Sequence, residues 1–105
     1  KATTDAVIGT EAVASLQHYH FSKGFFGTNG ITVEEGFTTP DIEEAMNKRV
    51  AMEHCRKCYV LADASKFEAL SNVSFGPLSK GVIITAAQEG LNVRSYKQHT
   101  EVIVL

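Results

Sequence analysis

The sequence predicts an α/β fold, with a mostly parallel β-sheet and helices packed against it. Four short runs rich in Val, Ile and Phe recur without strict polar alternation, which is typical of buried parallel strands. Segments of helical character separate these runs, and such alternation favours crossover connections between parallel strands. The predicted strands are Lys23–Phe26, Tyr59–Ala62, Gly81–Thr85 and Glu101–Leu105.

The strongest helix signal lies in the middle of the chain and starts at Thr39. We expect Thr39 to be the N-cap and Pro40 to occupy the first turn, with acidic residues following at the positive end of the helix dipole. One face of this helix is predicted to be buried and the other to face solvent. The expected buried stripe is Ile42, Ala45, Met46 and Val50, and the residues expected to face away are Glu43, Glu44, Lys48 and Arg49.

Three weaker helical segments complete the prediction. An earlier helix is expected over Thr10–Gln17, a short one over Ala86–Leu91 and a single turn over Ser95–Gln98. No internal repeat, low-complexity tract or long linker interrupts the chain, so residues 1–105 are interpreted as one unit.

Composition excludes several classes of protein. The 105 residues are 44% apolar, and no apolar run is long enough for a transmembrane helix. The chain does not start with a basic stretch followed by an apolar one, as a secretory signal would. Ten Lys and Arg against twelve Asp and Glu make the chain a poor candidate for binding a phosphate backbone by charge alone. Because the first residue is Lys1 and not Met, we expect a piece of a longer protein.

Cys55 and Cys58 form the only C-x-x-C pattern. A redox dithiol is usually found at a helix N-terminus, where the dipole lowers the thiol pKa, but this pair falls where a helix is expected to end. A closed zinc site needs four ligands, and no second ligand pair accompanies this one. We therefore expect two partly buried free cysteines, no metal and a reducing cytoplasm.

Polar residues follow the predicted strands where ligands bind in open α/β sheets, beyond the carboxyl ends. After the first strand, Asn29 and Gly30 could offer an amide and backbone N–H groups, or they could form an ordinary Asn-Gly turn. After the second strand, Asp63 and Lys66 could bind hydroxyls and a phosphate, or the segment could be a self-satisfied Asx turn with a solvated lysine.

Two further groups of polar residues are weaker candidates. Thr38 and Thr39 precede the central helix, where they could receive a ligand hydroxyl or simply cap the helix. His18 and His20 flank Tyr19, and no triad partner or second ligand pair accompanies them, so we interpret them as surface or partly packed residues.

The order of four motifs resembles the DeoR-type bacterial transcriptional repressors. The motifs are Gly9-Thr10, FSKGFFGTNGI from Phe21, GFTTP from Gly36 and ADASKF from Ala62. The resemblance covers nearly the whole chain and corresponds to the second half of the family's C-terminal effector-sensing domain. It is especially similar to sugar-phosphotransferase repressors of Gram-positive bacteria, those that govern the use of fructose or of lactose and galactose.

This resemblance implies a Rossmann-like sensor domain, similar to ribose-5-phosphate isomerase and the CoA-transferases. Such a domain binds a phosphorylated sugar, and binding weakens the hold of an N-terminal winged helix-turn-helix on operator DNA. Asp63 and Lys66 match family positions that take part in the inducer response. Asn29, Gly30, Thr38 and Thr39 match other parts of the pattern that lines the effector pocket. The helix-turn-helix and the family's Asp-x-Gly-Thr-Thr loop are absent from these residues.

We therefore expect a regulatory module with no catalytic residues and no cofactor, and with no direct contact to DNA or membrane. Because a parallel sheet without its leading strands exposes edges and apolar surface, a homo-oligomer is expected. The alternative is a sugar-phosphate isomerase, in which Asp63 would be the base and Lys66 would stabilise an oxyanion. A dimerisation module with a vestigial pocket is a third interpretation.

Overall fold

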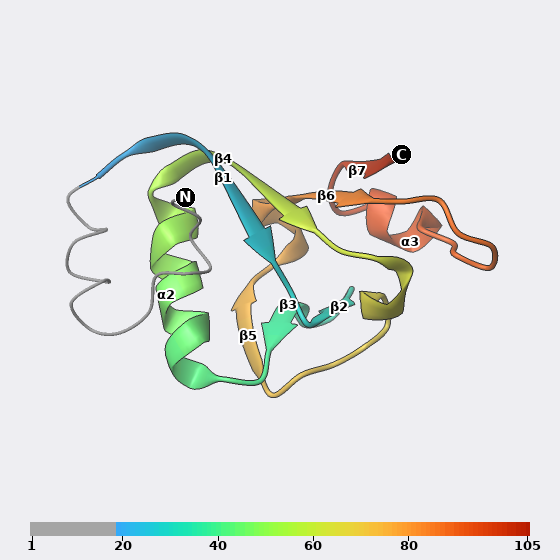
Figure 1. Cartoon of the computed structure of the whole chain (residues 1–105), viewed down its shortest axis with the longest axis horizontal. Helices are drawn as coiled ribbons and strands as arrows, with labels where there is room; N and C mark the ends of the chain where they lie inside the picture. Colours follow the sequence, from blue (N-terminus) through green and yellow to red (C-terminus); the bar gives the residue numbers. More distant parts are fainter. Residues whose placement is uncertain (1–18) are drawn as a thin grey trace.

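A computed structural model of the chain describes residues 19–105. Two sheets and two α-helices make up this part of the molecule (Figure 1). The four strands of the larger sheet are β1 (Phe21–Gly27), β4 (Cys55–Leu61), β6 (Val82–Thr85) and β7 (Val102–Val104). They lie side by side in the order β1-β4-β6-β7, and each neighbouring pair is parallel. The predicted α/β fold with a mostly parallel sheet is confirmed.

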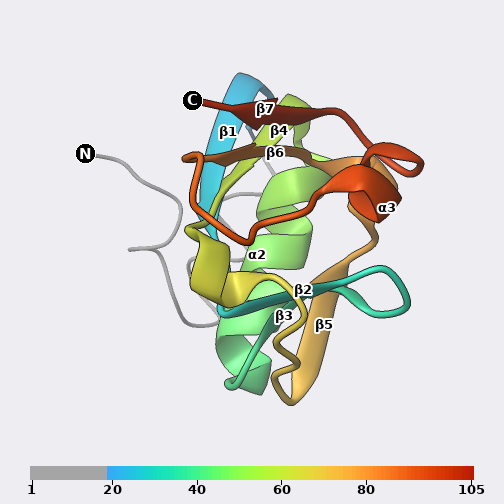
Figure 2. The same cartoon turned by 90° about the vertical axis from the view of Figure 1, so that its right-hand side faces the viewer.

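A second, antiparallel sheet was not predicted. It consists of β2 (Gly30–Thr32), β3 (Gly36–Thr39) and β5 (Val73–Gly76), in the order β2-β3-β5. The two sheets lie at the top and bottom of Figure 2. The segment that ends at Thr39 was interpreted only as the approach to a helix, whereas it is a fully buried strand. Its register depends on pairing with β5, more than 30 residues away in sequence.

The central helix, α2 (Ile42–Glu53), starts two residues later than predicted. Its N-cap is Asp41 and not Thr39, because Thr39 pairs with Val73 in the sheet. The Asp41 carboxylate accepts a hydrogen bond from the backbone N–H of Glu44 at 3.0 Å, as an N-cap does.

The buried face of α2 also differs from the prediction. Ile42 and Met46 are 59% and 57% exposed, whereas Lys48, expected to face solvent, is only 4% exposed. Helix α2 packs against strands of both sheets, so its buried face is wider and more polar than an apolar stripe suggests. The buried residues are Ala45, Asn47, Lys48, Ala51 and Met52.

The remaining helical predictions have mixed outcomes. The turn expected at Ser95–Gln98 is confirmed as α3 (Arg94–Lys97), but residues 86–91 form a loop and not a helix. The loop contains Gly90 with φ of +87°, a left-handed conformation that interrupts helical geometry. The helix expected over Thr10–Gln17 lies outside the described residues. Two short 3₁₀ turns, η2 (Ala64–Lys66) and η3 (Leu78–Lys80), precede β5 and β6.

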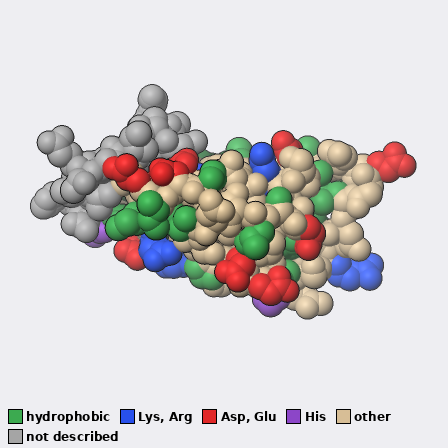
Figure 3. Space-filling view, turned by 90° about the horizontal axis from the view of Figure 1, so that it is seen from below, with side chains coloured by type: hydrophobic (Ala, Val, Ile, Leu, Met, Phe, Trp, Pro, Cys, Tyr) green, Lys and Arg blue, Asp and Glu red, His purple; other side chains and the backbone are tan. Residues whose placement is uncertain are grey.

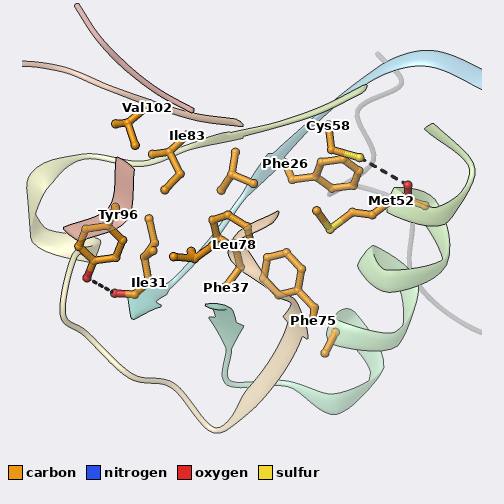
Figure 4. Packing of buried hydrophobic residues seen from close by; sticks show 13 residues of the cluster. Phe26, Ile31, Phe37, Met52, Cys58, Phe75, Leu78, Ile83, Tyr96 and Val102 are labelled. Carbon is orange, nitrogen blue, oxygen red and sulfur yellow. Dashed lines mark hydrogen bonds between the residues drawn. The ribbon is translucent and has the colours of Figure 1, made fainter. Parts of the chain in front are cut away.

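The core fills the space between the two sheets and α2 (Figure 4). Val60 and Ile83 enter it from the larger sheet, Phe37 and Phe75 from the smaller one, and Tyr96 from α3. On the opposite face of the larger sheet, Phe25 and Leu61 are about half exposed. The described helices therefore lie on one face of this sheet.

The Asp41 cap provides a test of the corrected helix start. Replacing Asp41 with Ala should reduce the free energy of unfolding by about 1 kcal/mol, because the N–H of Glu44 loses its acceptor. Asp41→Asn retains an acceptor and should cost much less. Urea denaturation followed by circular dichroism measures both. An equal loss in Thr39→Val and none in Asp41→Ala would contradict the assignment.

Candidate functional site

The parallel register brings three chain segments to one edge of the larger sheet. Gly27 pairs with Leu61, and Leu61 pairs with Ile84, so β1, β4 and β6 end at the same level. The turn after β1, the η2 segment after β4 and the loop after β6 therefore all leave the sheet at its carboxyl edge. This is the edge where open α/β sheets bind ligands.

A pocket of about 670 Å³ lies at this edge, between the η2 segment and the loop after β6. Its walls come from residues 63–68, residues 88–92 and α3. Asp63 is the one residue of the predicted site that lines it. The lining residues are Asp63, Ala64, Ser65, Phe67, Glu68, Gln88, Glu89, Gly90, Leu91, Asn92 and Tyr96.

Asp63 is an exposed residue whose carboxylate organises the η2 turn. One oxygen, Oδ1, accepts hydrogen bonds from both the hydroxyl and the backbone N–H of Ser65, the latter at 2.9 Å. These two bonds, together with the nearby positive charge of Lys66, lower the pKa of the Asp63 carboxyl below its ordinary value. Asp63 is therefore an anion at neutral pH, preorganised by its own turn.

Lys66 is the last residue of η2, one turn away from Asp63. Its backbone N–H donates to the Asp63 carbonyl oxygen at 3.1 Å, and the residue is partly buried. It does not line the pocket, but its charge acts on Asp63. The side chain thus offers a cation beside the pocket and not inside it.

The other four predicted site residues occupy the turn after β1 and strands β2 and β3, outside the pocket. Asn29 is exposed, and its Oδ1 lies 3.1 Å from the hydroxyl of Thr39. Thr38 and Thr39 are fully buried, and Thr38 Oγ1 accepts the backbone N–H of Ser71 at 3.0 Å. A Cβ on Gly30 would lie 2.1 Å from the carbonyl oxygen of Ala69. These contacts tie the turn to residues 69–71.

Sequence reasoning missed Lys48, which also supports the turn after β1. Its Nζ donates to the Gly27 carbonyl oxygen at 2.8 Å and lies 3.5 Å from Glu44 Oε2. The same ammonium lies 4.9 Å from the centre of the Phe75 ring. A buried ammonium needs such partners, and here they connect α2 to the end of β1. A lysine on a predicted solvent face carries no sequence signal for this role.

Glu68 and Tyr96 are pocket residues that the sequence also did not reveal. Glu68 has φ of +65°, the left-handed conformation that side chains other than glycine rarely adopt. Tyr96 is 1% exposed, and its hydroxyl hydrogen-bonds the Glu68 carboxylate and, at 3.0 Å, the carbonyl oxygen of Ile31. Burial and the adjacent Glu68 raise the pKa of Tyr96, so its hydroxyl stays protonated and donates. Twenty-eight residues separate the pair, and only the fold brings it together.

The cysteines behave as expected from their position. Both are free, with Cys58 buried and Cys55 partly buried, at the junction of α2 and β4. Burial is the main cause that raises the pKa of both thiols, to about 11 for Cys58, so neither is activated for redox chemistry. Residues 19–105 contain no group of three or more His, Cys, Asp or Glu arranged to hold a metal ion.

Two further sequence interpretations concern the surface. His20 is exposed, with its ring centre 5.5 Å from that of His54, and His18 lies outside the described residues. In the face shown in Figure 3, acidic side chains are interspersed with basic and apolar ones, and no continuous basic patch covers its described part. Among the described residues, no helix is long and apolar enough to cross a membrane.

Comparison with known proteins places these features in a family. A sequence model of the DeoR C terminal sensor domain matches residues 1–87. The chain belongs to this family. The Bacillus subtilis protein named "Uncharacterized HTH-type transcriptional regulator FruR" is 41% identical over 105 residues, which are 100% of this chain and 42% of that relative. The chain thus spans less than half the length of this relative.

Other relatives of the DeoR sensor chain have similar names. The HTH-type transcriptional regulator GlpR of Haloferax volcanii is 36% identical over 73% of this chain and 30% of its own length. The lactose phosphotransferase system repressor of Streptococcus mutans is 31% identical over 98% of this chain and 41% of its own length. All three relatives are named as transcriptional regulators or repressors, one of them as a repressor of the lactose phosphotransferase system.

The hydrogen bonds that Asp63 accepts within η2 predict that the stability of the fold depends on pH. Because the pKa of Asp63 is lower in the folded chain, the stability it contributes is present above its ordinary pKa and is lost as the pH falls through the folded pKa. Ser65→Ala removes the hydroxyl donor but keeps the N–H, so the pKa of Asp63 should move partway back toward its ordinary value. Carboxyl NMR titration measures this change. An unchanged pKa in Ser65→Ala would contradict the assigned cause.

Proposed function

We propose that this chain is the sugar-phosphate-sensing part of a DeoR-type repressor of sugar catabolism that acts in the cytoplasm. Effector binding at the carboxyl edge of the larger sheet would release operator DNA from a winged helix-turn-helix elsewhere in the full-length regulator. The observation that carries the proposal is the pocket at this edge, with the Asp63 carboxylate in its wall and Lys66 beside it. Residues 1–105 would then be part of the sensor domain.

The chemistry of the edge suits a phosphorylated sugar. Hydrogen bonds from Ser65 engage Asp63 Oδ1, and among the described residues none engages Oδ2, which remains available to accept a sugar hydroxyl. Lys66 would supply positive charge for the phosphate. The exposed amide of Asn29 would add a further contact, whereas the buried Gly30, Thr38 and Thr39 would act by holding the turn in place.

Regulation requires a difference in affinity between two states of the regulator. An effector shifts the equilibrium toward the DNA-free form only as far as it binds that form more tightly than the operator-bound form. The turn after β1 is connected to α2 through Lys48 and to residues 69–71 through Gly30 and Thr38. A ligand that moves this turn would therefore also act on the elements packed beneath it.

Lys66→Ala in the full-length regulator tests the proposed phosphate contact. Losing a charge-assisted hydrogen bond costs about 1.5–3 kcal/mol, so operator release should need roughly 10- to 100-fold more sugar phosphate. Fluorescence anisotropy of labelled operator DNA measures release during titration with fructose 1-phosphate, fructose 6-phosphate, galactose 6-phosphate and ribose 5-phosphate. Operator affinity without effector should not change.

Lys80→Ala is the matched control, because Lys80 also ends a 3₁₀ turn but precedes β6, at the opposite edge of the sheet. It should release the operator as the wild type does. Asp63→Asn keeps an oxygen that accepts the Ser65 N–H while removing the charge, so it should weaken the response with little loss of stability. Equal responses of the wild type and both site variants would remove these residues from the site.

We also propose that the regulator is a homo-oligomer. Phe25 and Leu61 are about half exposed on the face of the larger sheet opposite α2, and Phe25 stacks on Tyr59 with ring centres 5.2 Å apart. Burying such apolar area against a second copy is favourable. Light scattering of the full-length regulator at micromolar concentration should give at least twice the mass of one chain. A monomeric mass would contradict this proposal.

A further inference from the structure

Several hydrogen bonds fix the part of the pocket wall that Glu68 and Tyr96 form. Glu68 is the only residue other than glycine with positive φ among residues 19–105. Its N–H donates to the Ile31 carbonyl oxygen at 2.8 Å and lies 3.3 Å from the Tyr96 hydroxyl. Such a conformation costs energy and persists only where surrounding contacts impose it. Here the contacts fix where the Glu68 carboxylate lies.

Tyr96 is the buried partner that holds the Glu68 carboxylate in position. Figure 4 shows its ring in the core and its hydroxyl directed at the Ile31 carbonyl oxygen. Phe67 packs edge-on against the ring, with centres 5.0 Å apart. The single proton of this hydroxyl is shared between the Ile31 carbonyl oxygen and the Glu68 carboxylate, which therefore has one oxygen bound to the protein. Its other oxygen, Oε1, has no hydrogen-bond partner among the described residues.

The remaining polar side chains that line the pocket carry no positive charge. Asp63, Glu68 and Glu89 supply carboxylates, and Gln88 and Asn92 supply amides. No Lys or Arg is among the lining residues. Carboxylates repel a phosphate but accept hydrogen bonds from hydroxyls, and amides both donate to and accept from them. The pocket is therefore suited to the hydroxylated part of a ligand, and a phosphate would stay outside it, toward Lys66.

Thr85, the last residue of β6, carries a hydroxyl at the same edge of the sheet. The residue is 2% exposed, and its hydroxyl has no hydrogen-bond partner within the described part of the chain. Residues two apart in a strand share a face, so Thr85 points to the same side as Ile83, which packs in the core with Tyr96. The loop that supplies residues 88–92 starts directly after it. A buried hydroxyl without a partner is costly, and Thr85 itself does not line the pocket.

We propose that Glu68 is the specificity-determining residue of the effector site, binding sugar hydroxyls, and that Tyr96 is its positioning residue. This inference rests on the proposed function and deepens it, because it divides the effector between two places. The polyhydroxylated part lies against Glu68 and residues 88–92, and the phosphate lies on the Lys66 side. Discrimination between sugar phosphates of equal charge would then depend on Glu68. The requirement that the ligand carry a phosphate would depend on Lys66.

Isothermal titration calorimetry of the full-length regulator tests this division. The probes are fructose 1-phosphate, fructose 6-phosphate, galactose 6-phosphate and ribose 5-phosphate, with inorganic phosphate for comparison. Glu68→Gln should weaken binding of the preferred sugar phosphate at least tenfold and reduce its preference over the other three. Glu68→Gly accommodates the positive φ without strain, so it should keep or raise the melting temperature. It should show the same loss of affinity and selectivity as Glu68→Gln. Glu101→Gln, outside the pocket, is the matched control.

Tyr96→Phe keeps the ring in the core and removes only the hydroxyl. A positioning role predicts that it lowers affinity and selectivity, and that adding it to Glu68→Gln causes little further loss. A merely structural role would lower the melting temperature and leave the preference among the four sugar phosphates unchanged.

The outcomes separate this inference from the proposed function. If the wild type binds a sugar phosphate and both Glu68 variants keep its affinity and selectivity, the inference is wrong and the proposed function stands. If the wild type binds the operator but none of the four sugar phosphates, the proposed function is wrong and the inference fails with it.

Discussion

The parallel hydrogen bonding of β1, β4, β6 and β7 is the constraint on which the rest of the structure depends. Parallel strands cannot be joined by tight turns, so every connection must cross back over the sheet, and successive strands end at the same edge. Polar and charged residues from distant parts of the chain therefore lie together at the carboxyl edge of the sheet. The pocket with Asp63, Glu68 and Tyr96 exists because the chain leaves two of these strands, β4 and β6, at that edge.

The small antiparallel sheet makes that edge rigid. The backbone of Ile31, in β2, accepts hydrogen bonds from Glu68 and Tyr96, and Thr38, in β3, accepts one from Ser71. Gly30 allows β2 to approach residue 69 more closely than any side chain would permit. The segment after η2 is thus held against the small sheet at residues 68, 69 and 71. These contacts fix the backbone from which its polar side chains project. Preorganisation of this kind reduces the entropic cost of binding a small ligand.

Charge is distributed unevenly around the pocket. Its lining carries carboxylates and amides, while the cation of Lys66 lies beside it and that of Lys48 is buried under the turn after β1. A chain with a formal net charge of −2 has no general attraction for phosphate. Recognition of a phosphorylated ligand at this edge would therefore depend on a few placed groups.

Features that depend on neighbouring residues could be predicted from the amino-acid sequence alone. Apolar runs without alternation predicted the four parallel strands, and the placement of Asp63 and Lys66 after one of them predicted the carboxyl edge as the place for a site. The cysteine pair was correctly interpreted from its position at the end of a helix.

Tertiary structure alone decided the rest, because it depends on contacts between residues far apart in sequence. Strand β3 exists by pairing with β5, which moved the start of α2 from Thr39 to Asp41. Lys48 is buried because Gly27 and Phe75 meet it from other elements. Tyr96 reaches Glu68 only when α3 folds back over the sheet. No local sequence pattern encodes these contacts, because each of them depends on the packing of the whole chain.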